Sequence, residues 1–333
     1  MKYVLRRIAM FLVALLAISL IVFLMLRVLP GDIAAVMAGT NSPPERVAQL
    51  RAQMGLDKPL PQQYFEWVGG LLHGDFGMTM LTGQPVASVV ASRAAITFPL
   101  IVLGMLVALL FGIPLGYLAV RTTNRAAKAL FQTIAIIGGA IPALWGGLLL
   151  ILLFARGLGV FEVFPAQGFP SRGWTDPSRA LLSLVLPALT VGMIVGATIM
   201  RYTRSSLQTI ASSGYVEMAM ACGMTRRQAL WHVGMRLAMP QLVSVIGLTF
   251  AEMVTGVMVI ENLFALPGIG TGLVSDLGHR DLIAVQSELF MLAAFFLVIG
   301  LLVDLTQRLL AVEGLAAHQE QDLELAQVGN DVV

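Results

Sequence analysis

The residue types that most often do chemistry are scarce and scattered in this chain of 333 residues. A phosphate-binding P-loop needs a lysine that follows a glycine, and none of the three lysines does so. No HExxH or GxSxG pattern occurs, and the four histidines lack the spacing of zinc ligands. The glycine-rich run 266–272 predicts a tight turn rather than a nucleotide loop, because no strand precedes it. We therefore expect no catalytic residue, metal site or cofactor in the chain, which is not predicted to be an enzyme.

Glu252 is the residue most unusual for its surroundings, since it lies about ten residues into the apolar run 241–263. A lone carboxylate at that depth in a membrane costs about 2.5–3.5 kcal/mol on insertion scales, so it should face a bundle interior or water. Two interpretations remain open. Glu252 lines a substrate pathway, or it makes a hydrogen bond between helices.

A polar stretch between two long apolar runs has the pattern of a binding element. Residues 215–222 predict a short helix, which Gly223 would end as the residue after the C-cap. Residues 225–228 form a capping box that starts a second helix. The small residues Ala219, Ala221 and Gly223 would let another surface approach the backbone closely, although a solvated interfacial loop is the simpler interpretation.

The composition shows which elements must hold these residues. Hydrophobic residues make up 57% of the chain and charged residues 12%, against about 25% charged in a typical soluble domain. The mean hydropathy is +0.84, so we expect an all-α integral membrane protein in a lipid bilayer. A net charge of +2 gives no reason to expect a nucleic-acid partner. Six segments approach the length of about 20 apolar residues that a bilayer requires: 8–28, 96–120, 129–154, 181–200, 241–263 and 286–311.

The distribution of charge predicts that both termini lie in the cytoplasm. Lys2, Arg6 and Arg7 precede the first apolar run, and no small-x-small cleavage site follows it, so we expect an uncleaved first span. With six spans, 12 of the 21 basic residues lie in the inner segments, in agreement with the positive-inside rule.

The chain divides into four predicted regions. They are an N-terminal cytoplasmic segment with the first span (1–28), an extracytoplasmic region of amphipathic helices (29–92), a core of five spans with the polar loop 201–240 (93–312), and a mobile cytoplasmic tail (313–333). In the second region, apolar residues recur at helical spacing from Tyr64 to Leu71. That face either packs against the bundle, which we favour, or docks an external protein.

The pattern Glu217-x-Ala219-x-x-x-Gly223 resembles the EAA signature of permease subunits of ABC importers, with Met218 where alanine is usual. Other short pieces resemble, in order, the branch that imports dipeptides, oligopeptides or nickel. They are Arg6-Arg7, Leu29-Pro30-Gly31-Asp32, 55–59, 73–77, Glu261-Asn262-Leu263-Phe264, Pro267-Gly268-Ile269-Gly270 and 280–286. The chain departs from that branch at Met220 and Cys222, where basic residues are usual.

The resemblance implies the type I ABC importer permease fold, with six transmembrane helices in the bacterial cytoplasmic (inner) membrane. It implies that the polar stretch is a coupling helix that inserts into a separate ATPase. The implied coupling residues are Tyr215, Glu217, Met218, Ala219, Ala221, Gly223, Met224 and Thr225.

The same resemblance implies the partners and the transported substrate. The partners are a second homologous permease, two ATPase subunits or domains that hold ATP and Mg²⁺, and an extracytoplasmic substrate-binding protein. Short peptides are the expected substrate, and nickel or a nickel chelate is the alternative. The alternative of another class is an ATP-independent secondary transporter or channel.

Overall fold

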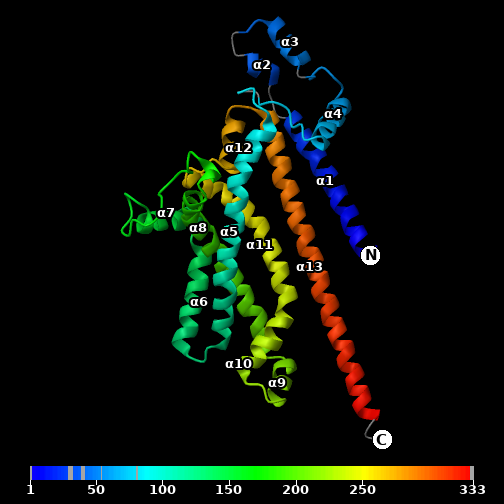
Figure 1. Ribbon diagram of the computed structural model, residues 1–333, viewed down its shortest axis with the longest axis vertical. Helices are drawn as coiled ribbons and strands as arrows, with labels where there is room; N and C mark the ends of the chain where they lie inside the picture. The colour runs from blue at the N-terminus through cyan, green and yellow to red at the C-terminus, as the bar shows by residue number, and fades with distance from the viewer. Residues whose placement is uncertain (1, 29–32, 39–41, 54, 80–81, 331–333) are drawn as a thin grey trace. The chain divides into compact units, whose positions relative to one another are not determined.

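Figure 1 shows the computed structural model, which describes residues 2–28, 33–38, 42–53, 55–79 and 82–330. Regular structure in these residues is helical, apart from isolated bridges between Met78 and Pro85 and between Ala155 and Phe164. The helices are α1 (Lys2–Val28), α2 (Ile33–Ala38), α3 (Pro44–Gln53), α4 (Leu60–Leu72), α5 (Val86–Arg121), α6 (Arg125–Ala140), α7 (Ala143–Phe154), η1 (Gly173–Thr175), α8 (Pro177–Ala211), α9 (Gly214–Ala221), α10 (Arg226–Ala229), η2 (Leu230–Gly234), α11 (Met235–Leu263), α12 (Ile269–Gly278) and α13 (Leu282–Asn330).

Five stretches within the described residues are long and apolar enough to cross a membrane. They are Tyr3–Arg27, Val86–Arg121, Pro177–Ala211, Arg226–Leu263 and Leu282–Leu309. They match the first, second, fourth, fifth and sixth predicted spans. The helices outlast the apolar runs, because hydrogen bonding along a helix does not stop where the side chains become polar. The predicted class, an all-α membrane protein, is confirmed.

The third predicted span, 129–154, is divided between α6 and α7, which are bent by 108° at a short break. Ile141 follows α6 in an extended conformation with φ −72° and ψ 122°. Pro142 explains this, since proline disfavours a helical conformation in the preceding residue and has no N–H to continue the ladder. A sixth span exists if the bent pair is counted as one.

The first of two compact units comprises 1–103, 143–190 and 254–298. Within it, α4 packs its aromatic face on α1 and α13. Phe23 contacts Tyr64 and Trp67 at ring-centroid distances of 5.4 and 6.1 Å, and Trp67 contacts Phe290 at 5.7 Å. These contacts favour the interpretation that the amphipathic face from Tyr64 to Leu71 packs against the other helices of its own chain, rather than docking an external protein.

The second unit comprises 104–142, 191–253 and 299–333. Here glycines let α5 and α8 approach closely, as is common between membrane helices. A Cβ at Gly112 would lie 2.7 Å from the carbonyl oxygen of Gly196, and a Cβ at Gly116 would lie 2.6 Å from Cβ of Thr203. Figure 1 shows α9 and α10 at one end of this unit, where the chain passes from α8 to α11.

Candidate functional site

α9 is a helix of about two turns whose ends follow from local sequence. Ser213 is extended before the helix, with φ −90° and ψ 155°. Gly223 follows the C-cap with φ +93°, a left-handed conformation that costs glycine little because it has no Cβ. The Gly223 N–H donates to the carbonyl oxygen of Met220 (3.0 Å), and the Met224 N–H donates to that of Ala219 (3.1 Å). This pair of bonds is a Schellman motif, so the predicted helix stop at Gly223 is confirmed.

The predicted capping box at Thr225 is also confirmed. The Gln228 N–H donates to Oγ1 of Thr225 (3.3 Å), and the Thr225 N–H donates to Oε1 of Gln228 (2.9 Å). The helix that starts here is not a separate short element, however. It continues through α10 and η2 into α11, so Arg226–Leu263 is one helical stretch that is long and apolar enough to form a single span.

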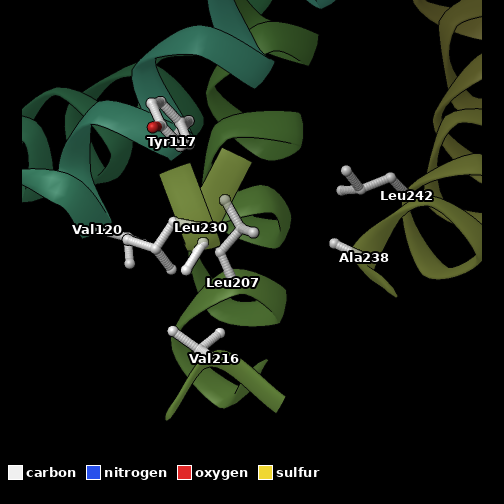
Figure 2. Close-up of a cluster of buried hydrophobic side chains, with 8 residues drawn as sticks. Tyr117, Val120, Leu207, Val216, Leu230, Ala238 and Leu242 are labelled. Atoms are coloured by element: carbon white, nitrogen blue, oxygen red, sulfur yellow. The ribbon is translucent and has the colours of Figure 1, made fainter. Parts of the chain in front are cut away.

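One face of α9 is buried in a hydrophobic cluster that joins it to longer helices (Figure 2). The buried members are Tyr117, Val120, Leu207, Val216, Ala229, Leu230, Ala238 and Leu242. They come from α5, α8, α9, and the continuous helix that begins with α10. Burying a valine or leucine side chain contributes about 1.5–3 kcal/mol to stability. The burial of Val216 therefore fixes α9 against α5, α8 and the helix that begins with α10.

The other face of α9 is exposed and largely apolar. Tyr215 is 62% exposed and Met218 61%, and Met220 and Met224 are exposed beside them. Glu217 and Ala221 are exposed as well, while Ala219 packs partly against the cluster. Clustered exposed apolar side chains are typical of a binding surface, and flexible thioethers adapt well to a partner. We name the exposed residues of 215–224 the α9 surface.

η2 is a π-helical turn that sequence reasoning missed. The buried positions Leu230, Gly234, Ala238 and Leu242 recur every four residues, whereas an α-helix has about 3.6 residues per turn. A regular helix would rotate this stripe by about 40° at each step. The wider π turn reduces that drift and keeps the stripe facing the cluster. The repeated spacing of four was the available signal.

Glu252 lies on the exposed face of α11. It is 23 residues beyond Ala229, or about 35 Å along a helix, so the structure does not bring it together with the α9 surface. Four other carboxyl groups among the described residues are buried instead: those of Glu261 and Glu288, both 0% exposed, and those of Asp276 and Asp281. Sequence reasoning selected Glu252 because it lies near mid-span, although exposure depends on which helix face is covered.

Glu261 caps a neighbouring helix in the first unit. Its carboxyl group accepts hydrogen bonds from the hydroxyl of Thr97 (2.5 Å) and from the N–H groups of Gly270 (2.7 Å) and Thr271 (3.3 Å). Thr97 in turn accepts from the Ile269 N–H (2.8 Å). These are the free N–H groups at the start of α12, which need acceptors when buried. α12 begins at Ile269, inside the glycine-rich run 266–272 that was expected to form a tight turn, and its first turn is capped from α11.

Arg93 holds α12 to α13 in the same unit. Its guanidinium donates to the carboxyl groups of Asp276 and Glu288. Asp276 is 183 residues away and Glu288 is 195. The only available signal in the sequence was the presence of charged residues next to apolar runs, and that signal did not identify the pairs.

Comparison with known proteins connects this architecture to transport. The family described as "Binding-protein-dependent transport system inner membrane component" matches residues 108–312, and its N-terminal companion matches residues 1–100. The "Probable peptide ABC transporter permease protein y4tP" of Sinorhizobium fredii is 32% identical over 312 residues, covering 92% of this chain and 97% of that protein. The glutathione transport system permease protein GsiC of Escherichia coli K12 is 34% identical over 304 residues, covering 91% of this chain and 95% of that protein.

A solved structure supports the fold. A chain of the MetNI methionine ABC transporter, in inward-facing conformations, superposes with a TM-score of 0.53 at 19% identity, covering 67% of this chain and 96% of that one. Together with the family match and the apolar helices, this identifies the class. The chain belongs to the binding-protein-dependent transport system inner membrane component family, as a multi-pass permease subunit of an ABC transporter in the bacterial inner membrane, a class in which separate subunits hydrolyse ATP.

Proposed function

We propose that this permease imports short peptides that an extracytoplasmic substrate-binding protein delivers. It forms the membrane path with a second, homologous permease, and two ATPase subunits or domains dock on its cytoplasmic side. ATP and Mg²⁺ bind in those ATPases and not in this chain. Two relatives, one named as a peptide permease and one as a glutathione permease, support peptide-like substrates.

The main support for a contact with the ATPase is the exposed α9 surface. Its exposed tyrosine and methionines would be unfavourable in water without a partner. The face behind it is fastened through Val216 to helices that continue into the membrane. An element held in this way can pass on a rigid-body movement, which a mobile loop cannot do.

Eight residues form the proposed coupling site. They are Tyr215, Glu217, Met218, Ala219, Ala221, Gly223, Met224 and Thr225. The first five shape or support the exposed side of α9, and the last three form the corner that ends α9 and starts the next helix. ATP binding draws the ATPases together, the corner follows, and α11 moves with it as the path changes sides. Both termini and the coupling site lie in the cytoplasm, and Glu252 faces the path.

Co-purification tests the coupling site. The tagged chain is solubilised from its native cells in mild detergent, and its partners are identified by mass spectrometry. Glu217→Arg places the opposite charge on the exposed face of α9. Glu45→Arg, at an exposed position in α3, is the matched control. We expect a P-loop ATPase and a second permease with the wild-type chain and the control, and loss of the ATPase with Glu217→Arg.

Uptake measurements test the transported substrate. Proteoliposomes that contain the purified complex and its binding protein are supplied with trialanine or with Ni²⁺. Uptake of trialanine that requires ATP supports the proposal. Uptake of Ni²⁺ alone would transfer the assignment to a nickel importer. A wild-type chain that purifies alone and moves solute without ATP would contradict the importer class.

A further inference from the structure

α11 exposes a polar face along its membrane-spanning length. The exposed positions between residues 241 and 262 are Gln241, Ser244, Leu248, Glu252, Thr255, Val259 and Asn262. Successive members are three or four residues apart, so they lie on one side of the helix. Five of the seven are polar. We call these seven residues the α11 stripe.

Other spanning helices expose apolar side chains near the middle of their length. In the middle of α5 the exposed residues are Val102, Leu106, Leu110 and Phe111, and in α13 they include Phe296, Val298 and Leu302. Such faces suit hydrocarbon, where no water can satisfy a polar group. The α11 stripe therefore faces something other than lipid.

Glu252 is the single charged member of the stripe. The structure records no hydrogen bond or ion pair for Glu252 among the residues that it describes, and a Cβ built at Gly256, one turn further on, would meet no atom within 4 Å. A dry contact with another helix would bury this carboxylate without a cation from its own chain, which is costly. A water-filled path leaves the carboxylate hydrated and within reach of a solute.

We propose that the α11 stripe lines a water-filled part of the substrate path, and that Glu252 makes this part selective for solutes that carry an ammonium group. This inference rests on the proposed function and names the group that the path recognises. Thr255, beside Glu252, has a hydroxyl that can hydrogen-bond to a peptide backbone, and the only formal charge of the stripe is negative. Charge complementarity thus favours the amino terminus of a peptide and disfavours anionic solutes.

Charged thiol reagents can measure the effect of the negative charge of Glu252 on solutes that approach the stripe. Thr255, three residues from Glu252, lies about 5–6 Å away on the same face. Thr255→Cys is prepared with Glu252 intact and with Glu252→Gln, in the full complex in proteoliposomes. A cationic and an anionic methanethiosulfonate are applied, and mass spectrometry follows residue 255 separately from the native Cys222, the single cysteine of the chain. Leu106→Cys, on the apolar face of α5, is the matched control.

We expect residue 255 to react faster with the cationic reagent. One charge at about 6 Å in water changes a rate about threefold, in opposite directions for the two reagents, so Glu252→Gln should lower the cation-to-anion rate ratio about tenfold. The control at residue 106 should react with neither reagent. An unreactive residue 255 would mean that another chain covers the stripe, and an unchanged ratio would mean that Glu252 does not set the charge preference. Either result overturns the proposal.

Uptake in the same proteoliposomes separates this inference from the function on which it rests. Glu252→Gln should lower the uptake rate of trialanine at least threefold by the same estimate, while the complex stays assembled. Full trialanine uptake by this variant would overturn the ammonium preference and leave the importer function standing. Failure of the wild-type complex to take up trialanine would instead contradict the importer function. If only Ni²⁺ uptake depends on Glu252, the recognised group is a metal cation and the ammonium assignment is wrong.

Discussion

Removal of the Glu261 side chain should destabilise the protein strongly, although this residue is not part of the α9 surface. Its carboxyl group is the acceptor for the Thr97 hydroxyl and for two backbone N–H groups at the start of α12. All of these groups are buried or half-buried. Glu261→Ala leaves three donors without a partner.

The expected magnitude follows from those three donors. A buried donor left without its acceptor costs about 1–3 kcal/mol. The bond to Thr271 is long, at 3.3 Å, and contributes least. We therefore expect Glu261→Ala to lower the free energy of unfolding by about 4 kcal/mol. Glu261→Gln keeps the shape and one acceptor oxygen but loses the charge, so we expect it to lower the free energy of unfolding by about 1–2 kcal/mol.

Thr97→Val tests whether the bonds act as one network. The Thr97 hydroxyl links Glu261 to the Ile269 N–H, so the two side chains share partners. The double variant Thr97→Val with Glu261→Ala should therefore cost less than the sum of the two single variants, by about 1 kcal/mol.

The assay is reversible unfolding of the purified chain in mixed micelles, followed by far-ultraviolet circular dichroism. Glu45→Ala, an exposed carboxylate in α3, is the control and should change the free energy of unfolding by less than about 0.5 kcal/mol. A loss below about 1 kcal/mol for Glu261→Ala, or strict additivity with Thr97→Val, would refute the reasoning.

Three further predictions use the same assay. Arg93→Met leaves two buried carboxyl groups without their cation and should cost about 3–5 kcal/mol, so an unchanged unfolding midpoint would contradict the role of Arg93. Gly268→Ala places a Cβ against the carboxyl group of Glu261 and should lower stability, but by less when Glu261→Ala has already made room. Hydrogen bonds from Lys58 and then Gln62 lower the pKa of exposed Glu66. Any stability that ionised Glu66 gains from these two hydrogen bonds should be present at neutral pH and be lost as pH falls through that lowered pKa. In Glu66→Gln this pH-dependent change in the free energy of unfolding should be absent. A change as large as that of the wild-type chain would contradict the prediction.

The sequence predicted features that depend on neighbouring residues. Apolar runs of about 20 residues identify spans because transfer into lipid depends on local composition. The stop at Gly223 and the capping box at Thr225 were predictable because both motifs satisfy backbone groups within a few residues. The break at Pro142 is also local in origin, because proline restricts the residue before it, but it was not predicted, since 129–154 was expected to form one span.

Only the tertiary structure determined which charges are buried and which are exposed. Glu252 and Glu261 occur on one helix, nine residues apart, yet one is exposed and the other is fully buried. The sequence does not specify which face α12 covers. Likewise, the partners of Arg93 are more than 180 residues away, so no local pattern could select them. Hydrophobicity and helix capping act over short stretches of chain, whereas the partner of a buried charge depends on which helices pack together.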